Sequence, residues 1–154
     1  MEVELVPISW LKPHEEVKPG NVESLYDITL RWNAYTKPLL VDGRTGTILD
    51  GHHRYHVGLR IGLLRLPVIK VDYLDDKGIE LDIWPGSDLE TLTKQEVVEM
   101  ALSGKLYPPK TSRHRYSDYL PAIAVPLDRM RSLYWVHHLG FSTEPTIDVF
   151  SRQA

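Results

Sequence analysis

Five consecutive residues, Asp50-Gly51-His52-His53-Arg54, bring a carboxylate, a glycine, two imidazoles and a guanidinium together. They follow an apolar run and precede a helical pattern, so we expect a strand-to-helix corner. The first backbone N–H groups of a helix lack intrahelical partners, and the helix dipole favours an anion there. Gly51 lets the backbone approach a ligand closely, and Arg54 can hold a phosphate or carboxylate through two hydrogen bonds. The pattern predicts a phosphate-binding corner, although Asp50 alone is also typical of a helix N-cap.

A second unusual stretch is Tyr107-Pro108-Pro109-Lys110-Thr111-Ser112-Arg113-His114. Its two prolines predict a loop, and the residues from Lys110 onward can donate hydrogen bonds or carry positive charge. The same composition is typical of a solvated basic loop, so the stretch by itself leaves both interpretations open.

Other catalytic chemistries are excluded or disfavoured by what the chain lacks. It contains no cysteine, which excludes disulfides, thiolate metal sites and cysteine nucleophiles. His52 and His56 have a spacing that can hold zinc on a helix. No glutamate of the usual zinc-hydrolase pattern lies nearby, so metal hydrolysis is disfavoured and we expect no metal held by the protein alone.

The bulk properties are those of an ordinary globular protein. The chain has 154 residues, 42% of them hydrophobic and 25% charged, which is enough for one domain with a buried core. A net charge of -3 gives no general attraction to nucleic acid. The first ten residues do not form a signal peptide, and no apolar run reaches membrane-spanning length. We therefore expect a soluble, cytoplasmic protein.

The elements that must position these residues can be predicted from apolar periodicity and capping patterns. A turn around Pro13 should deliver His14, Glu15 and Glu16 to a loop. A helix is expected from Asn21, with one face formed by Val22, Leu25, Tyr26, Thr29 and Trp32. A capping box, Thr93 with Glu96, should open a helix that ends at Gly104. We further expect strands over 2–7, 37–41, 47–49, 66–73 and 79–84, and a helix over 51–60 ending at Gly62.

Several segments, in order, resemble the free L-serine kinases of the ParB/sulfiredoxin-like fold. They are Lys12-Pro13-His14-Glu15, Lys37-Pro38, Leu49-Asp50-Gly51-His52-His53-Arg54-Tyr55, and the run from Gly104 to His114. The resemblance covers most of residues 1–130. It implies an α/β (α+β) domain, a small mixed β-sheet flanked by helices, with residues 131–154 as a C-terminal extension packed on the same domain. Characterised archaeal members are longer, with additional sequence where this chain has only residues 85–103.

The resemblance implies a kinase that transfers a phosphoryl group from ADP or ATP to the hydroxyl of free L-serine or a similar molecule. The product, O-phospho-L-serine, would feed cysteine or related biosynthesis. The implied phosphate-binding and nucleotide-binding residues are Gly51, His52, His53, Arg54, Lys110 and Thr111. Ser112, Arg113 and His114 would bind the substrate.

Two carboxylates are the candidate catalytic groups. Glu15 matches the family's loop glutamate and would be the general base, whereas composition alone leaves it as a surface carboxylate beside Glu16. Asp50 could share the base role, orient the acceptor, or help to place Mg²⁺, which bridges phosphates with few protein ligands. Trp84, Tyr107 and Trp32 are candidates to stack on adenine, although each is also a typical core residue.

Three other functions occur in this fold. Sulfiredoxins need a cysteine at the corner, where this chain has His52. ParB-type partition proteins hold DNA through a following helix-turn-helix, and this chain has little helical sequence after residue 104. The alternative that stays open is a non-catalytic ParB-like module that binds nucleotide and acts in regulation or in association with DNA.

Overall fold

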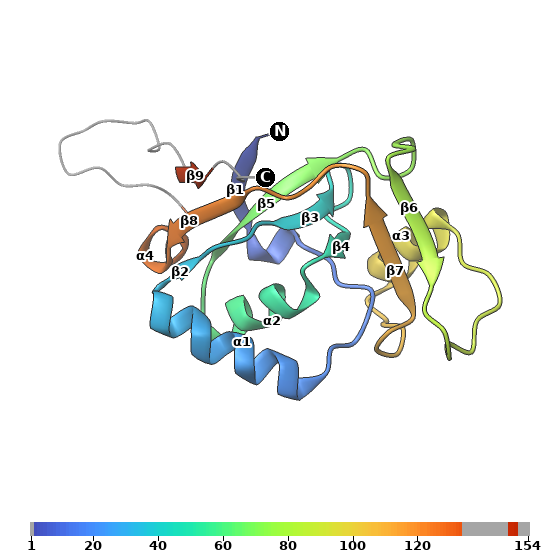
Figure 1. The fold of residues 1–154 in the computed structure, drawn as a ribbon, viewed down its shortest axis with the longest axis horizontal. Coiled ribbons are helices and arrows are strands. Elements are labelled where there is room, and N and C mark those ends of the chain that lie inside the picture. Colours follow the sequence, from blue (N-terminus) through green and yellow to red (C-terminus); the bar gives the residue numbers. More distant parts are fainter. Residues whose placement is uncertain (1, 134–147, 151–154) are drawn as a thin grey trace.

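A four-stranded mixed sheet lies at the centre of the computed structural model, which describes residues 2–133 and 148–150 (Figure 1). Its strands, in spatial order, are β1 (Val3–Pro7), β5 (Arg65–Val71), β3 (Leu39–Asp42) and β4 (Ile48–Asp50). β3 runs parallel to β5, whereas β1 is antiparallel to β5 and β4 is antiparallel to β3. The predicted small mixed sheet is confirmed.

Two smaller sheets extend this centre. One contains β2 (Ala34–Tyr35), β8 (Ala122–Pro126) and β9 (Asp148–Phe150), with β8 in the middle. The other pairs β6 (Ile79–Ile83) with β7 (Ser112–Tyr116) in antiparallel register. This second pair stands beside the main sheet, on the opposite side of the molecule from α1 (Pro19–Trp32) (Figure 1).

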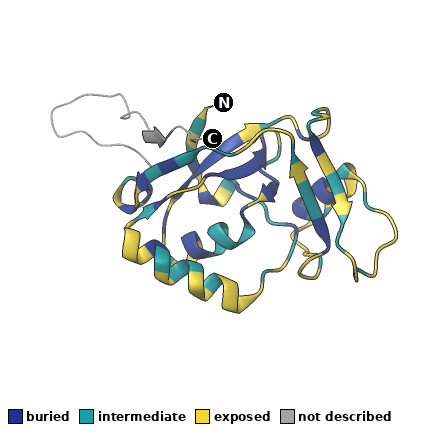
Figure 2. Cartoon of the chain, in the orientation of Figure 1, coloured by how far each residue is buried: buried dark blue, intermediate teal, exposed yellow. Residues whose placement is uncertain are grey.

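The helices differ in how they contact the sheets. α2 (His52–Ile61) packs on the core through Gly58, where an added Cβ would lie 2.9 Å from Leu66. α1 (Pro19–Trp32) lies outside α2, and its outward face is exposed (Figure 2). α3 (Lys94–Ser103) packs near β6 and β7 (Figure 1). The short elements η1 (Ile8–Trp10) and α4 (Leu127–Met130) follow β1 and β8.

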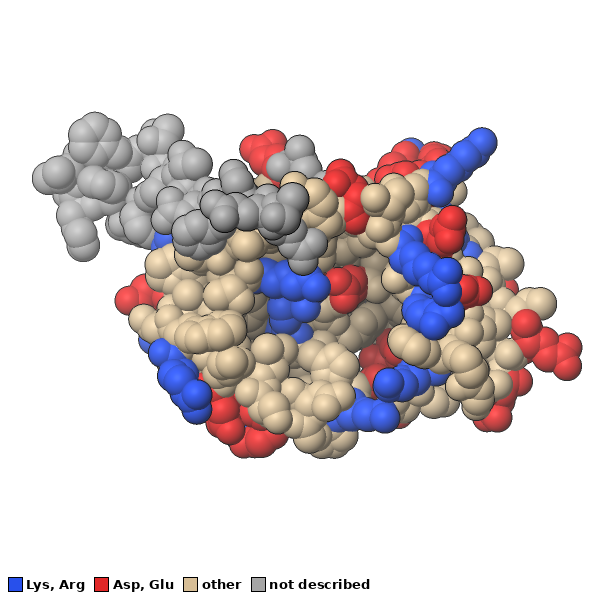
Figure 3. All heavy atoms as spheres, in the orientation of Figure 1, with Lys and Arg blue, Asp and Glu red and all other residues tan. Residues whose placement is uncertain are grey.

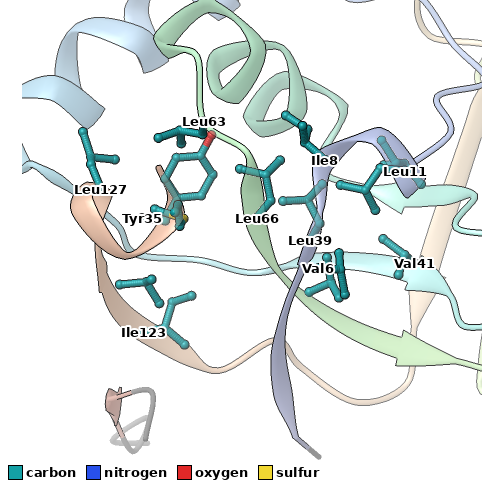
Figure 4. Packing of buried hydrophobic residues seen from close by; sticks show 14 residues of the cluster. Val6, Ile8, Leu11, Tyr35, Leu39, Val41, Leu63, Leu66, Ile123 and Leu127 are labelled. Atoms are coloured by element: carbon teal, nitrogen blue, oxygen red, sulfur yellow. The ribbon is translucent and has the colours of Figure 1, made fainter. Parts of the chain in front are cut away.

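Two clusters of buried apolar side chains form the core. The larger contains residues of β1, β3 and β5 together with Tyr35, Leu63 and Ile123 (Figure 4). The smaller lies toward α3 and includes Tyr73, Ile79 and Val97. β3 and β4 contribute to both clusters, because Leu39 and Ile48 belong to the larger and Leu40 and Leu49 to the smaller.

Most predicted elements are present, with three corrections. α1 begins at Pro19 rather than Asn21, because proline at the first helical position has a backbone angle already suited to a helix. Trp32 is 52% exposed and does not belong to a buried face. The second half of the predicted loop is strand β7, because Ser112, Arg113 and His114 pair with residues of β6.

The helix ends agree with the capping patterns in the sequence. The Thr93–Glu96 capping box is confirmed, and Gly62 and Gly104 end their helices in the left-handed conformation. β8 was not predicted. Residues 134–147, including Trp135, His137-His138 and Phe141, lie outside the described residues. Among the residues that are described, no helix has both the length and the apolar character needed to cross a bilayer.

Candidate functional site

The strand-to-helix corner is set by Gly51, which separates β4 from α2. Its φ angle of 113° lies in the region that side-chain-bearing residues rarely adopt. A Cβ at this position would lie 2.6 Å from Leu39 Cγ. The tight turn therefore needs glycine, and it leaves the N-terminus of α2 open without a side-chain cap.

A cleft of about 260 Å³ opens in front of this corner (Figure 3). One side is formed by the first residues of α2 and the other by β7 with the loop before it. Glu15 and Trp84 also line the cleft. The full lining comprises Glu15, Glu16, Val17, Lys18, Asn21, Leu49, Asp50, Gly51, His52, His53, Trp84, Pro109, Lys110, Ser112, Arg113 and His114.

Two helix N-termini reach this one cleft. Gly51, His52 and His53 belong to the start of α2, and Lys18 and Asn21 belong to the start of α1. Neither helix has a side-chain cap at this end. Because the positive ends of both helix dipoles meet there, together with the Lys18 cation, the cleft is suited to a polyanion such as a nucleotide phosphate chain.

Glu15 is held in the cleft by the start of β7. Its Oε1 accepts hydrogen bonds from the backbone N–H of Ser112 (2.8 Å), the Ser112 hydroxyl (2.9 Å) and the backbone N–H of Thr111 (3.2 Å). A parallel bridge to Tyr107 fixes the backbone of Glu15. Within the described residues, Oε2 accepts no hydrogen bond, so one oxygen is anchored and the other is available to a ligand.

Three histidine rings gather behind Glu15. The ring centroid of His14 lies 4.5 Å from that of His52 and 5.9 Å from that of His114. Burial, reinforced by His114, lowers the pKa of His14 to about 3. Burial also lowers the pKa of His114 to about 4 and that of His52 well below its ordinary value. The rings are therefore neutral at physiological pH, and they do not supply positive charge for phosphate binding.

Arg54 does not face the cleft. Its guanidinium donates to the Pro38 carbonyl (3.1 Å) and lies 3.6 Å from the Asp50 carboxylate, and it is absent from the residues that line the cleft. Asp50 lines the cleft, is 49% exposed, and also lies 3.9 Å from the Lys37 ammonium. In this arrangement Arg54 ties the corner to the entry of β3.

The opposite wall carries two cations and an indole ring. The Lys110 ammonium lies 5.0 Å and the Arg113 guanidinium 4.8 Å from the centre of the Trp84 ring. Arg113 also pairs with Asp82 at 3.4 Å. Such stacking holds both cations at the cleft while leaving them able to meet an anion.

The structure brings most predicted site residues together at the cleft. Two exceptions are Arg54, described above, and Thr111, whose hydroxyl donates to the Pro108 carbonyl and whose side chain lies outside the lining. The aromatic candidates divide: Trp84 lines the cleft, whereas Tyr107 and Trp32 line other hollows.

Sequence reasoning missed the contribution of α1. The cleft is lined by Val17, Lys18 and Asn21, and the sequence motifs predict none of them as site residues. Pro19-Gly20 just after Lys18 was the available signal, because proline marks a helix start. Sequence reasoning also missed His14 as a functional side chain, because His14 entered only as part of a segment that resembles the kinase family.

The described residues contain no group of three or more potential ligands that could hold a metal ion by themselves. This composition is compatible with Mg²⁺ that is bound mainly by nucleotide phosphates, since such ions use only one or two protein carboxylates. The His52–His56 pair is therefore not part of a three-ligand metal centre in the described part of the chain.

Comparison with known proteins gives two kinds of relative. The chain is 30% identical over 160 residues to a ParB-like protein of Sulfolobus acidocaldarius, with 96% of this chain and 74% of that protein covered. It is 28% identical over 98 residues to an ATP-dependent L-serine kinase of Staphylothermus marinus. That match covers 61% of this chain but only 38% of the kinase. The chain matches no protein-family model.

Solved structures of free serine kinases share the fold. One in complex with AMP superposes with a TM-score of 0.75 at 17% identity, covering 84% of this chain and 93% of the other. A mutant form in complex with ADP also has a TM-score of 0.75 at 17% identity, with 84% and 94% of the two chains covered. The predicted ParB/sulfiredoxin-like fold is confirmed by these superpositions.

Proposed function

The chain belongs to the ParB-like protein family in which free serine kinases are found, and from that premise we propose that it is a small-molecule kinase. It transfers a phosphoryl group from a nucleotide to the hydroxyl of free L-serine and releases O-phospho-L-serine. The observation that carries this proposal is the anchored Glu15 carboxylate in a cleft where two helix N-termini meet. A phosphoryl transferase needs these two features, a site for phosphates and a base for the acceptor.

In the proposed reaction the phosphate chain lies at the start of α2, where Gly51, His52 and His53 line the cleft and the N–H groups of the helix start bind it. The serine hydroxyl attacks the terminal phosphorus while Oε2 of Glu15 takes its proton. The bond between that phosphorus and the bridging oxygen breaks, and the shortened nucleotide leaves with the electron pair. Lys110 and Arg113 at the opposite wall neutralise charge on the phosphoryl group and on the serine carboxylate.

Mg²⁺ would enter with the nucleotide, and Asp50 is the corner carboxylate placed to contribute a ligand. Such an ion supplies charge neutralisation for the transferring phosphoryl group. We propose ATP as the donor, since two relatives are named ATP-dependent L-serine kinases, and ADP is the donor to be tested against it.

The test is a phosphoryl-transfer assay with purified chain, Mg²⁺, ATP or ADP, and a panel of free hydroxy amino acids and small polyols. We expect O-phosphoserine with ATP. Glu15→Gln, which keeps the size and loses the basic carboxylate, should lower turnover by about 10²–10⁴-fold without loss of nucleotide binding. Glu90→Gln, at an exposed position away from the cleft, is the matched control.

The other outcomes are equally informative. Transfer to a different hydroxyl compound would keep the mechanism and replace the acceptor. Transfer from ADP and not from ATP would reverse the donor. Nucleotide binding by the unaltered chain with no transfer to any acceptor would reject the kinase and favour the non-catalytic nucleotide-binding module.

A further inference from the structure

A chain of hydrogen bonds runs from the buried His14 ring to the Glu15 carboxylate through a serine. His14 Nε2 lies 2.9 Å from Ser112 Oγ, and Ser112 Oγ donates to Glu15 Oε1 at 2.9 Å. A hydroxyl group has one hydrogen, and here that hydrogen is given to the carboxylate. The Ser112 oxygen must therefore accept from His14, so the proton of the neutral His14 ring lies on Nε2.

The surroundings of His14 keep the ring in this single form. Its side chain is completely buried, and its Nδ1 makes no hydrogen bond of regular geometry among the described residues, although the Ile48 backbone faces the ring and opposes the lowering of its pKa. The rings that face it are His52 from α2, His114 from β7, and Tyr107 from the loop before β7. His52 Nε2 accepts the backbone N–H of His14, so it carries no proton on that nitrogen. The Glu15 carboxylate lies at the far end of the hydrogen-bond chain.

We propose that His14 and Ser112 are positioning residues that orient the Glu15 carboxylate, with neutral His14 as the fixed donor and Ser112 as the link. This inference rests on the proposed role of Glu15 as the base. His14 anchors the hydroxyl, the hydroxyl anchors Oε1, and Oε2 is thereby turned to the reacting hydroxyl. The Ser112 side chain, predicted to bind substrate, has both its donor and an acceptor position used within the protein.

The direct test uses variants that differ in one hydrogen-bond donor. Ser112→Ala removes the link, and His14→Met removes the donor at similar volume. His14→Gln retains an N–H donor at the position of Nε2. We expect the first two to lower kcat on the order of 10–10²-fold, because a small misplacement of a catalytic group has effects of this size. The nucleotide Kd from calorimetry should not change, and His14→Gln should recover most of the lost kcat.

The pH profile of kcat separates positioning from proton transfer. Because His14 stays neutral, His14→Gln should keep the wild-type profile from about pH 5 to about pH 9. Loss of one limb of the profile in His14→Gln would mean that His14 itself exchanges protons with the reaction, which would overturn the positioning role. Circular dichroism establishes that each variant is folded, and Ser112→Ala serves if His14→Met does not fold.

A spectroscopic measurement tests the geometry without turnover. ¹⁵N NMR of the histidine rings should show His14 with the proton on Nε2, and Ser112→Ala should shift that signal. A proton on Nδ1 would overturn the hydrogen-bond chain. Transfer that is insensitive to both Ser112→Ala and His14→Met would overturn the positioning role alone. Absence of transfer by the unaltered chain would reject the proposed function and the positioning role with it.

Discussion

The two walls of the cleft are built in opposite ways. At the α2 corner, the residues that line the cleft form the contiguous run Gly51–His53 at the start of a helix without a side-chain cap. At the β7 side, which we call the Glu15 wall, the Glu15 carboxylate is held by Thr111 and Ser112, 96 and 97 residues away in the sequence. The corner depends on local backbone geometry, whereas the Glu15 wall depends on packing between distant segments. Changes to the Gly51 turn should therefore affect nucleotide binding, and changes that release the Glu15 carboxylate should affect turnover.

The largest expected effect comes from adding one methyl group at the corner. Gly51→Ala combines a left-handed backbone with contact at 2.6 Å to Leu39, so unfolding free energy should fall by about 2–5 kcal/mol. Nucleotide binding should fall with it. Urea unfolding and calorimetry measure both. Gly62→Ala is the matched control, because Gly62 has a similar φ of 85° with open space around it. Equal losses in the two variants would contradict the role of close approach.

Acidification should weaken the histidine cluster at the Glu15 wall. The pKa values of His14 and His114 are lowered from 6.5 to about 3 and about 4 in the folded chain. As the pH falls below 6.5, the unfolded chain takes up these protons and the folded chain does not. Stability should therefore decrease from about pH 6.5 to about pH 4, by about 1.4 kcal/mol per pH unit for each ring.

Unfolding free energies measured by urea titration across that pH range test this expectation. In His14→Gln the slope of unfolding free energy against pH should be smaller by the contribution of one imidazole ring. A slope that is identical in the unaltered chain and in His14→Gln would show that His14 does not contribute.

Arg54→Ala tests whether the corner binds phosphate through side chains or through the backbone. Since Arg54 holds the Pro38 carbonyl and Asp50 instead of lining the cleft, we expect a loss of about 1.5–3 kcal/mol in stability. Nucleotide affinity, measured under conditions where the variant is folded, should change less than the stability does. If nucleotide affinity fell by that amount and stability did not change, Arg54 would be a phosphate-binding residue.

Asp50→Asn should act on turnover more than on folding. Its carboxylate is half exposed, so the pairs with Lys37 and Arg54 should contribute less than about 1 kcal/mol to stability. A role in orienting the acceptor or Mg²⁺ predicts about a tenfold loss of kcat. Asp75→Asn, an exposed carboxylate paired with Arg44, is the control. Full activity of Asp50→Asn would exclude a role of Asp50 in orienting the acceptor or Mg²⁺.

The smallest expected effect is at Lys110, which has a positive φ of 58°. Lys110→Gly should stabilise the fold by about 0–1 kcal/mol, because relief of the backbone strain outweighs the greater entropy that glycine loses on folding. Lys110→Ala removes the same charge and keeps the strain. Both should weaken nucleotide binding equally, and a difference between them would mean that the loop conformation, and not the charge, determines affinity.

The sequence by itself determined the features that depend on a few neighbouring residues. The corner at Gly51, the capping box at Thr93 and the helix ends at Gly62 and Gly104 were all predictable, because backbone angles and capping groups act within one helical turn. The absence of cysteine excluded whole classes of chemistry. The family resemblance added the fold and the candidate base.

Only the tertiary structure decided which of these groups share a site and in which direction they point. It joined Glu15 to Ser112, brought the start of α1 to the start of α2, and turned Arg54 away from the cleft toward Pro38. It also made β7 a strand where proline and polar residues had suggested a loop. Contacts of this kind depend on how apolar faces pack across long sequence separations, and local composition does not encode that arrangement.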